Sequence, residues 1–426
     1  MQRRLTVRYW ILQIHCWLGL LSGLVVLIVS ITGCLFVFQK EITELLHKER
    51  YFISPAVASP ARSASSCEVP PTPLPLSLLQ QKAQHVLGAG RPITTILTWR
   101  QPDRTWEFMA YQDNDTAFTY FGAIGYYQSV FLDPYTGAVT GNQDHKYDFF
   151  SIVKYIHWSL LLNTAYGQPI VGWSTLIFVI LLITGLVLWW PKKWNPSARN
   201  RSFKIKWKAS FKRVNYDLHN VPGFYSLFPA LIISLTGLVF AFKWFTALVY
   251  LLCCGRTTAP APSFARSQPP DTAMVHITIH EPGNALTDVG IGSALLPLDK
   301  AFLLARRSLP GAQRIALSPA TGKEGVIYIF GYEGRETYYG YDALQFDQYT
   351  GRLLQWRKDK EKKAGERLVE MNYDIHVGAI GGLAGKIIAF IASLICASLP
   401  VTGFFIWWGK KRKGRSYPSS NKIARQ

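Results

Sequence analysis

The sequence predicts a membrane protein in which four transmembrane helices form an α-helical bundle built from a tandem repeat, with two α+β domains on one side of the membrane. Three observations predict this fold class. Four apolar stretches are long enough to cross a bilayer, two long polar segments lie between them, and the second half of the chain repeats the pattern of the first. The apolar stretches cover residues 10–38, 170–190, 225–252 and 383–408.

The composition indicates a chain that lies partly in lipid and partly in water. Of the 426 residues, 49% are apolar and 17% are charged. The chain is therefore too apolar for an ordinary soluble protein and too charged to lie wholly in the membrane. Each apolar stretch reaches the roughly 20 residues that a hydrocarbon core requires. The first stretch is much longer than the apolar region of a cleaved signal peptide, so we expect it to be retained.

Positive charge is concentrated in three segments. Residues 1–9, 191–213 and 409–426 carry three, nine and seven Lys or Arg and no Asp or Glu, while the net charge of the whole chain is +20. By the positive-inside rule, both termini and the middle loop are cytoplasmic. The two long polar segments then face the periplasm, if the host is a Gram-negative bacterium. Because this charge lies at membrane boundaries, we expect no binding to nucleic acid.

These assignments divide the chain into nine segments. They are a cytoplasmic N-terminus (1–9), the first span (10–38), an outer domain (39–150), an outer helical segment with the second span (151–190), a basic cytoplasmic loop (191–213), the third span (214–252), a second outer domain (253–370), an outer helical segment with the fourth span (371–408) and a basic cytoplasmic tail (409–426).

The spans repeat in pairs, which is the strongest structural signal in the sequence. At an offset of 204 residues the first span matches the third at nine positions, and at an offset of 218 the second matches the fourth at six. The matches include His15/His219, Gly19/Gly223, Thr32/Thr236, Thr184/Thr402 and the Trp-Trp pairs 189–190/407–408. His157 and His376 also correspond, one residue out of step.

The two outer segments repeat as well. Each begins with an apolar helical pattern, at 76–86 and at 298–308, and continues with three segments rich in β-branched and aromatic residues. The last of these ends in Asp133-Pro-Tyr-Thr-Gly137 in one copy and in Asp347-Gln-Tyr-Thr-Gly351 in the other. One unit, a span followed by a domain and a second span, therefore occurs twice.

Four of the nine histidines lie at matching ends of the spans. His15 and His219 are expected near the cytoplasmic face, and His157 and His376 near the periplasmic face. Two facing imidazoles at each level would complete an iron that a porphyrin already holds by four nitrogens. Gly19 and Gly223 each lie one helical turn after an inner histidine, where a missing side chain would leave room for a flat macrocycle.

The outer pair is expected on short helical segments at the periplasmic interface. The 33 residues from 157 to 190 would span roughly 50 Å as one straight helix, which is longer than a hydrocarbon core. We therefore expect a break at Gly167-Gln-Pro169. In the fourth span the glycines at 378, 381, 382 and 385 are expected to supply the break.

The sequence also allows other assignments for these residues. The histidines could instead be interfacial side chains bonded to backbone or lipid headgroups. Each Thr-Gly pair is read first as close helix packing, and the Trp-Trp pairs as an interfacial aromatic belt. The sequence has no Cys-x-x-Cys-His for covalent haem. A metal site at His276 and His280, and a disulfide from Cys67 to Cys253 or Cys254, remain open.

The motifs carry a resemblance to a known family. A helix-then-sheet outer domain that closes on Asp-x-Tyr-Thr-Gly, flanked by a span with an early His and Ser-x-Thr-Gly and by one ending in Thr-Gly-x-x-x-Trp-Trp, resembles the PepSY-associated transmembrane family. Within it the chain is similar to the siderophore-reductase branch, the FoxB-like iron-regulated membrane proteins. The resemblance covers nearly the whole chain and implies two PepSY-like periplasmic domains and b-type haem on His15, His157, His219 and His376.

The expected function is therefore an inner-membrane di-haem b reductase that passes electrons to a periplasmic ferric siderophore and releases Fe(II). Two bis-histidine haems b are the expected cofactors, held by His15 with His219 and by His157 with His376, and we expect no catalytic residue beyond these ligands. The sequence has no nucleotide-binding fingerprint, so the donor is a separate reductase or a membrane quinol. The alternatives are another periplasmic acceptor, or a non-enzymatic sensory or assembly protein of the membrane.

Overall fold

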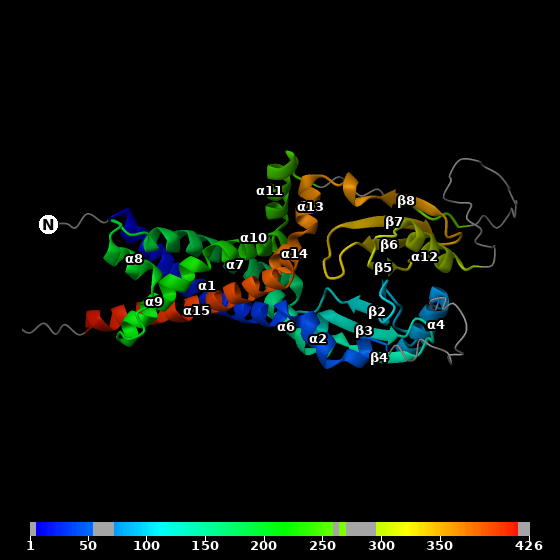
Figure 1. The fold of residues 1–426 in the computed structure, drawn as a ribbon, viewed down its shortest axis with the longest axis horizontal. Helices are drawn as coiled ribbons and strands as arrows, with labels where there is room; N and C mark the ends of the chain where they lie inside the picture. The colour runs from blue at the N-terminus through cyan, green and yellow to red at the C-terminus, as the bar shows by residue number, and fades with distance from the viewer. Residues whose placement is uncertain (1–5, 54–71, 259–263, 270–294, 416–426) are drawn as a thin grey trace, which may run out of the picture.

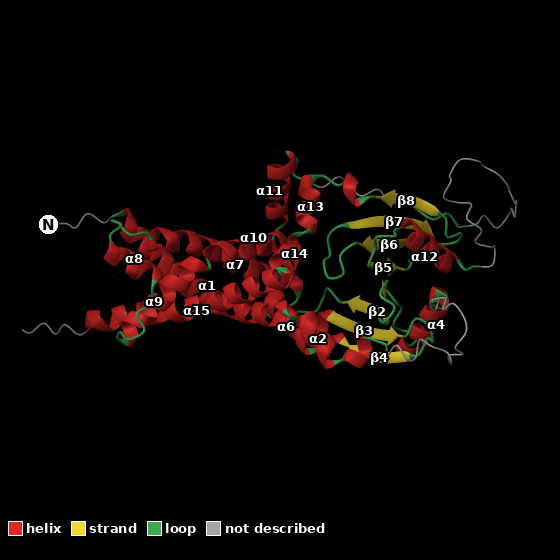
Figure 2. Ribbon diagram, in the orientation of Figure 1, coloured by secondary structure: helices red, strands yellow, loops and turns green. Residues whose placement is uncertain are grey.

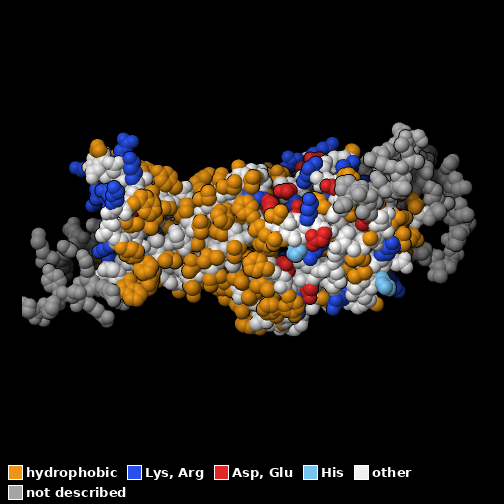
Figure 3. Space-filling view, turned by 60° about the horizontal axis from the view of Figure 1, so that its bottom comes forward, with side chains coloured by type: hydrophobic (Ala, Val, Ile, Leu, Met, Phe, Trp, Pro, Cys, Tyr) orange, Lys and Arg blue, Asp and Glu red, His pale blue; other side chains and the backbone are white. Residues whose placement is uncertain are grey.

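The protein is an elongated molecule with a helical bundle at one end and a β-sheet at the other (Figures 1 and 2). The structure is a computed structural model that describes residues 6–53, 72–258, 264–269 and 295–415. We call the end of the bundle that touches the sheet domain the sheet end, and the opposite end, where Lys and Arg side chains gather, the basic end (Figure 3). His276 and His280, for which a metal site was left open, and Cys67, for which a disulfide was left open, lie outside the described residues.

Apolar helices long enough to cross a membrane form the bundle. Three single helices are long and apolar enough to cross a membrane: α1 (Val7–Val37), α7 (Thr164–Trp189) and α15 (Gly382–Arg415). A fourth span forms if α9 (Phe211–Tyr225) and α10 (Leu227–Ala241) count as one bent helix. Exposed apolar side chains cover the face of the bundle that Figure 3 shows, and α1, α7 and α15 all carry such side chains. These features are those of a membrane protein.

The third span differs from the expected one. It bends by 68° at Ser226 and ends at Ala241, whereas the sequence predicted an apolar run to residue 252. Pro222 lies inside α9, four residues before the bend, and a proline within a helix removes a backbone bond and kinks it. Extended backbone at Phe242 then ends α10, and α11 (Lys243–Cys254) is a separate helix that points away from the bundle axis (Figure 1).

The outer helical segments are separate short helices, as expected, but one break is displaced. It lies at residues 160–163, between α6 (Phe149–Ser159) and α7, where Leu160 and Leu161 have positive φ. Gly167, expected within the break, instead lies in the first turns of α7, where a Cβ would come within 1.9 Å of the Ser159 carbonyl oxygen. Its role is to let the two helices approach. In the fourth span the break falls at Gly378 and Gly382, both with positive φ, after α14 (Asn372–His376).

The two outer segments build one sheet rather than two. Its eight antiparallel strands run in the order β4-β3-β2-β1-β5-β6-β7-β8, and β1 and β5 join the halves with Leu97 opposite Ala316. The sequence predicted three strands per half; the fourth of each, β4 and β8, follows the Asp-x-Tyr-Thr-Gly turn. The bounds are β1 (Thr95–Trp99), β2 (Trp106–Asp113), β3 (Ile124–Leu132), β4 (Val139–Asp144), β5 (Arg314–Ser318), β6 (Val326–Tyr332), β7 (Tyr341–Asp347) and β8 (Leu353–Arg357).

Short helices connect these elements. They are α2 (Gln39–Leu46), α3 (Lys48–Tyr51), α4 (Leu76–Leu87), α5 (Tyr120–Ala123), α8 (Pro196–Phe203), α12 (Pro297–Ser308), α13 (Ala364–Glu370) and the 3-10 turns at His145–Tyr147, Asp359–Glu361 and Ala379–Gly381.

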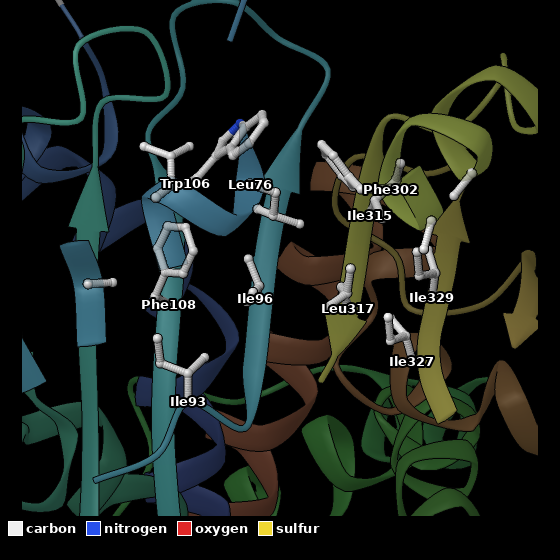
Figure 4. Packing of buried hydrophobic residues seen from close by; sticks show 14 of the residues in the cluster. Leu76, Ile93, Ile96, Trp106, Phe108, Phe302, Ile315, Leu317, Ile327 and Ile329 are labelled. Carbon is white, nitrogen blue, oxygen red and sulfur yellow. The ribbon is translucent and has the colours of Figure 1, made fainter. Parts of the chain in front are cut away.

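The main apolar core lies where the two halves of the sheet domain meet (Figure 4). Ile96 on β1 and Leu317 on β5 are fully buried on neighbouring strands. Trp106 of the first half packs edge-on against Phe302 of the second, with ring centroids 5.4 Å apart. The carboxylate of Asp299 on α12 accepts bonds from Ser77 on α4. The two repeats therefore fold around a shared core.

Trp106→Ala is expected to destabilise the sheet domain by about 3–5 kcal/mol, because truncating a buried aromatic side chain leaves a cavity. Trp106 is 2% exposed and contacts the other half of the domain. The measurement is chemical unfolding of the full chain in detergent, followed by circular dichroism. Trp207→Ala is the control, since Trp207 is 68% exposed and should change stability by less than about 0.5 kcal/mol. Equal effects of the two substitutions would contradict the shared core.

Candidate metal centres

Two pairs of histidines face each other inside the bundle. At the basic end, His15 on α1 and His219 on α9 have ring centroids 6.4 Å apart and ring planes crossed at 90°. At the sheet end, His157 on α6 and His376 on α14 lie 6.0 Å apart at 68°. The structure thus brings together both pairs that the sequence predicted, at two depths of one bundle.

The separation within each pair suits two axial ligands of one metal ion. Metal–imidazole nitrogen bonds are about 2 Å long, and each nitrogen lies about 1.1 Å from the centre of its ring, so two ligands across one ion have centroids about 6.3 Å apart. The observed 6.4 and 6.0 Å are close to this value.

A threonine hydroxyl contacts the Nδ1 atom of every one of these rings. At the basic end, His15 pairs with Thr184 at 2.9 Å and His219 with Thr402 at 3.0 Å. At the sheet end, the partners are Thr32 for His157 at 3.2 Å and Thr236 for His376 at 2.9 Å. These four threonines are the repeat-equivalent Thr-Gly residues of the spans.

The glycine that follows each threonine lies against the same ring. A Cβ on Gly33 would be 3.2 Å from Cε1 of His157, and one on Gly403 would be 3.3 Å from Cε1 of His219. The corresponding distances are 3.4 Å from Gly185 to His15 and 3.5 Å from Gly237 to His376. We call each Thr-Gly pair that contacts a histidine in this way a Thr-Gly seat. From the sequence these pairs were interpreted first as helix packing and were not linked to the histidines; their position opposite each histidine is the signal that would have revealed the contact.

Each half of the protein holds its own histidines. His15 of α1 rests on the seat of α7, and His157 of α6 rests on the seat of α1. In the second half, His219 rests on the seat of α15 and His376 on the seat of α10. The asparagine four residues before each of these histidines adds a hydrogen bond: Asn215 donates to the Thr402 carbonyl and Asn372 to the Thr236 carbonyl. A facing pair therefore takes one ligand from each half.

The cavity beside His15 and His219, the inner pair at the basic end, can accommodate a flat ligand. It has a volume of about 390 Å³, within the range of small-molecule pockets, roughly 300–1,000 Å³. Gly19 and Gly223 line it, as expected for helix faces without side chains, and apolar residues such as Leu182 surround them. Arg8 and Lys410 also line this cavity.

The cavity beside His157 and His376, the outer pair at the sheet end, is smaller and has a volume of about 110 Å³. A macrocycle between these two rings would need the surrounding side chains to move outward. Small residues make up much of its wall, including Gly172, Gly237 and Ser234. Phe178 lines both cavities. The two candidate centres are therefore neighbours within one bundle.

The donor set indicates which kind of metal group fits. In the described part of the chain, no group of three or more His, Cys, Asp or Glu side chains gathers around a point. Two imidazoles leave most positions of a transition metal ion to be filled by a ligand from outside the protein. A planar macrocycle with four nitrogens would supply the missing number, and at the basic end the cavity walls that contain Gly19 and Gly223 suit its shape.

An ionic cluster joins the sheet end of the bundle to the sheet domain. The buried Nζ of Lys386 on α15 contacts the carboxylates of Glu41 and Glu336, and Lys40 lies 3.3 Å from Glu336. Burial raises the pKa of Glu336, but Lys40 and Lys386 outweigh it and hold that pKa below its usual value. The cluster fixes the helix of the fourth span against the loop that follows β6.

The carboxyl of Asp374 lies two residues before His376 and is fully buried. Burial raises its pKa, although the backbone N–H of Tyr338 donates a bond to it at 2.8 Å and partly offsets this effect. Tyr338 packs edge-on against Tyr373 and is itself half-exposed. This loop places aromatic surface beside the helix that carries His376.

Comparison with known proteins identifies one family. A family model described as the PepSY-associated TM region matches residues 12–410. A search of curated proteins found no match.

Proposed function

Since the chain belongs to the PepSY-associated TM region family, and since its bundle holds two facing histidine pairs, we propose that it is a di-haem b electron-transfer reductase of the bacterial inner membrane. Its proposed acceptor is a ferric siderophore in the periplasm, which is reduced by one electron to release Fe(II). The observation that supports this proposal best is the geometry of the pairs: centroid separations of 6.4 and 6.0 Å suit axial ligation of one iron each.

The placement of charge supports the orientation. The basic end carries Arg8, the Lys pair at 192–193 and Lys410, and positive residues favour the cytoplasmic side. Both termini and the inner pair are then cytoplasmic, while the outer pair and the sheet domain, with its two PepSY-like halves, are periplasmic. A separate donor, a soluble reductase or a membrane quinol, would deliver electrons at the basic end.

The chain's own residues would determine what chemistry is available. When bound, haem b supplies a one-electron couple. His15 with His219, and His157 with His376, would each hold one haem iron through two imidazoles. An iron held in this way would have no place left for oxygen or a substrate, which favours electron transfer. The buried apolar side chains of Phe178, which lines both cavities, and of Leu182 would exclude water from the region between the pairs.

The acceptor chemistry needs little from the protein. Hard oxygen chelators hold ferric iron far more tightly than ferrous iron, so one electron is enough to loosen the metal. The acceptor only has to approach the outer pair, which lies at the sheet end on short helices. The half-exposed Tyr338 and the tyrosines that surround it border this approach.

Reduction in reconstituted vesicles tests the proposal. The chain is inserted into vesicles that enclose dithionite, a ferric hydroxamate chelate is added outside, and an external Fe(II)-binding dye reports the product. We expect dye signal with the wild-type chain and with His47→Ala, whose exposed ring lies outside both pairs. His15→Ala should reduce the signal to that of vesicles without protein.

Two outcomes would count against the proposal in different ways. If His15→Ala reduced the chelate as fast as the wild type, the histidine pairs would not be the route. If the wild type reduced a cytochrome or cupric ion outside but not the chelate, the route would stand and the acceptor would be wrong.

A further inference from the structure

The threonine hydroxyl of each Thr-Gly seat donates its single proton to a backbone carbonyl. Thr402 donates to the Ser398 carbonyl at 2.8 Å, and Thr184 donates to the Ile180 carbonyl at 2.8 Å. Thr32 and Thr236 donate in the same way to Ile28 and Ile232. Since a hydroxyl has one proton and two lone pairs, its oxygen must accept from the imidazole. Every histidine of the two pairs is therefore protonated on Nδ1.

Backbone carbonyls support this assignment at the sheet end. Nδ1 of His157 lies 2.8 Å from the Val29 carbonyl oxygen, and Nδ1 of His376 lies 3.0 Å from that of Ile233. A carbonyl oxygen only accepts, so Nδ1 of both rings must donate. The lone pair of each ring is then on Nε2, the atom on the other side of the ring.

The seats also prevent the rings from turning. Two adjacent ring atoms are contacted: Nδ1 by the threonine oxygen, and Cε1 by the glycine. At Gly33 and Gly403 a Cβ would press on Cε1, and at Gly185 and Gly237 it would be in van der Waals contact with it. For the inner pair, the seats are on different helices, α7 for His15 and α15 for His219. The angle between the two ring planes, 90° here, is therefore determined by the bundle and not by a bound metal.

From this geometry we infer that Thr32, Thr184, Thr236 and Thr402 are positioning residues, which present each histidine to the metal through Nε2 and keep the two rings of a pair crossed. The inference rests on the proposed haem function and adds a role for these residues to it. Partners that hold the second nitrogen of a ligating imidazole fix its tautomer and orientation.

Crossed imidazole planes have a spectroscopic consequence. The two iron orbitals that overlap with the imidazole π systems become nearly equal in energy when the rings are perpendicular, and they differ in energy when the rings are parallel. A low-spin ferric iron between crossed rings gives a strongly anisotropic electron paramagnetic resonance (EPR) signal, whereas parallel rings give an ordinary rhombic one. Both pairs should give the anisotropic type, and the inner pair, at 90°, more strongly than the outer pair, at 68°.

The test replaces one seat hydroxyl without changing its shape. In Thr402→Val the Nδ1–H of His219 loses its acceptor, while the side chain keeps its volume. We expect the anisotropic signal of one haem to shift toward the rhombic type, and that haem to leave the protein about 10- to 100-fold more readily to an apo-haemoprotein acceptor. Thr402→Ser restores the oxygen and should give the wild-type spectrum. Thr184→Val tests the other seat of the same iron independently.

Thr43→Val is the matched control. Thr43 on α2 donates to the Gln39 carbonyl at 2.7 Å, as the seat threonines do to theirs, and it lines neither of the two cavities. It should keep both signals. If Thr402→Val and Thr184→Val kept the wild-type spectrum with both haems bound, the positioning role would be wrong while the proposed function stood. A wild-type chain without haem would instead overturn the proposed function itself.

Discussion

His219→Ala is expected to lower the haem content of the purified chain from about two per chain to about one. The variant removes one of two facing rings whose centroids are 6.4 Å apart, and His15 alone would hold the haem through a single imidazole. His15→Ala should have the same effect, because the pair acts as a unit. The measurement is the pyridine haemochrome absorbance per mole of protein, with His47→Ala as the control that keeps both haems.

The same variants separate the two centres in vesicles. With the inner centre lost, a reductant enclosed in the vesicle should no longer reach the outer centre. Dithionite added outside should still reduce the remaining haem, because the pair of His157 and His376 lies at the sheet end. If both His15→Ala and His219→Ala retained two haems, the ligand assignment would be wrong.

Gly19→Phe is expected to remove the same haem while leaving every ligand in place. Gly19 lines the cavity of about 390 Å³ beside His15 and His219. A Cβ at this position would meet only Cδ2 of Leu181, at 3.9 Å, an ordinary contact, so the fold has room for a side chain there. A phenyl ring extending into the cavity would then compete with a macrocycle for the same space. Haem content per chain and a thermal unfolding curve are the measurements.

Two controls accompany this substitution. Gly19→Ala adds only the Cβ and should keep both haems. Gly409→Phe places the same ring at a glycine of α15 that has nothing within 4 Å of its Cβ, and it should change neither haem content nor stability. Retention of two haems with an unchanged spectrum in Gly19→Phe would show that the cavity is not the binding site.

The sequence was sufficient to predict the pairing of the histidines because two strong signals coincide. Membrane spans are readable from composition alone, and the repeat aligns His15 with His219 and His157 with His376. The positions of the pairs at two depths then follow from where each histidine lies within its span. The alternating direction of successive spans brings the correct ends together.

Other features depend on contacts that the sequence does not encode locally. The bend at Ser226 follows Pro222, but a proline in an apolar run does not specify by how much a helix turns. The joining of β1 to β5 pairs strands more than two hundred residues apart, and only the match of their buried faces determines the register. The Thr-Gly seats were missed for a related reason: such pairs are common in packed membrane helices, and only the opposed histidine distinguishes them.

The two halves of the molecule meet in the same way at both ends. In the sheet domain, β1 of one half pairs with β5 of the other. In the bundle, each half holds its own histidines on its own seats, and each facing pair contains one histidine from each half. In the proposed function, a complete centre would therefore exist only when the halves are docked.

The haem content of the purified wild-type chain shows most directly whether the two facing histidine pairs hold haem. We expect a coloured protein with about two haems b per chain, one for each facing pair, and low-spin spectra typical of two imidazole ligands. A folded chain that is colourless after purification from haem-replete cells, and that takes up no added haem, would contradict it.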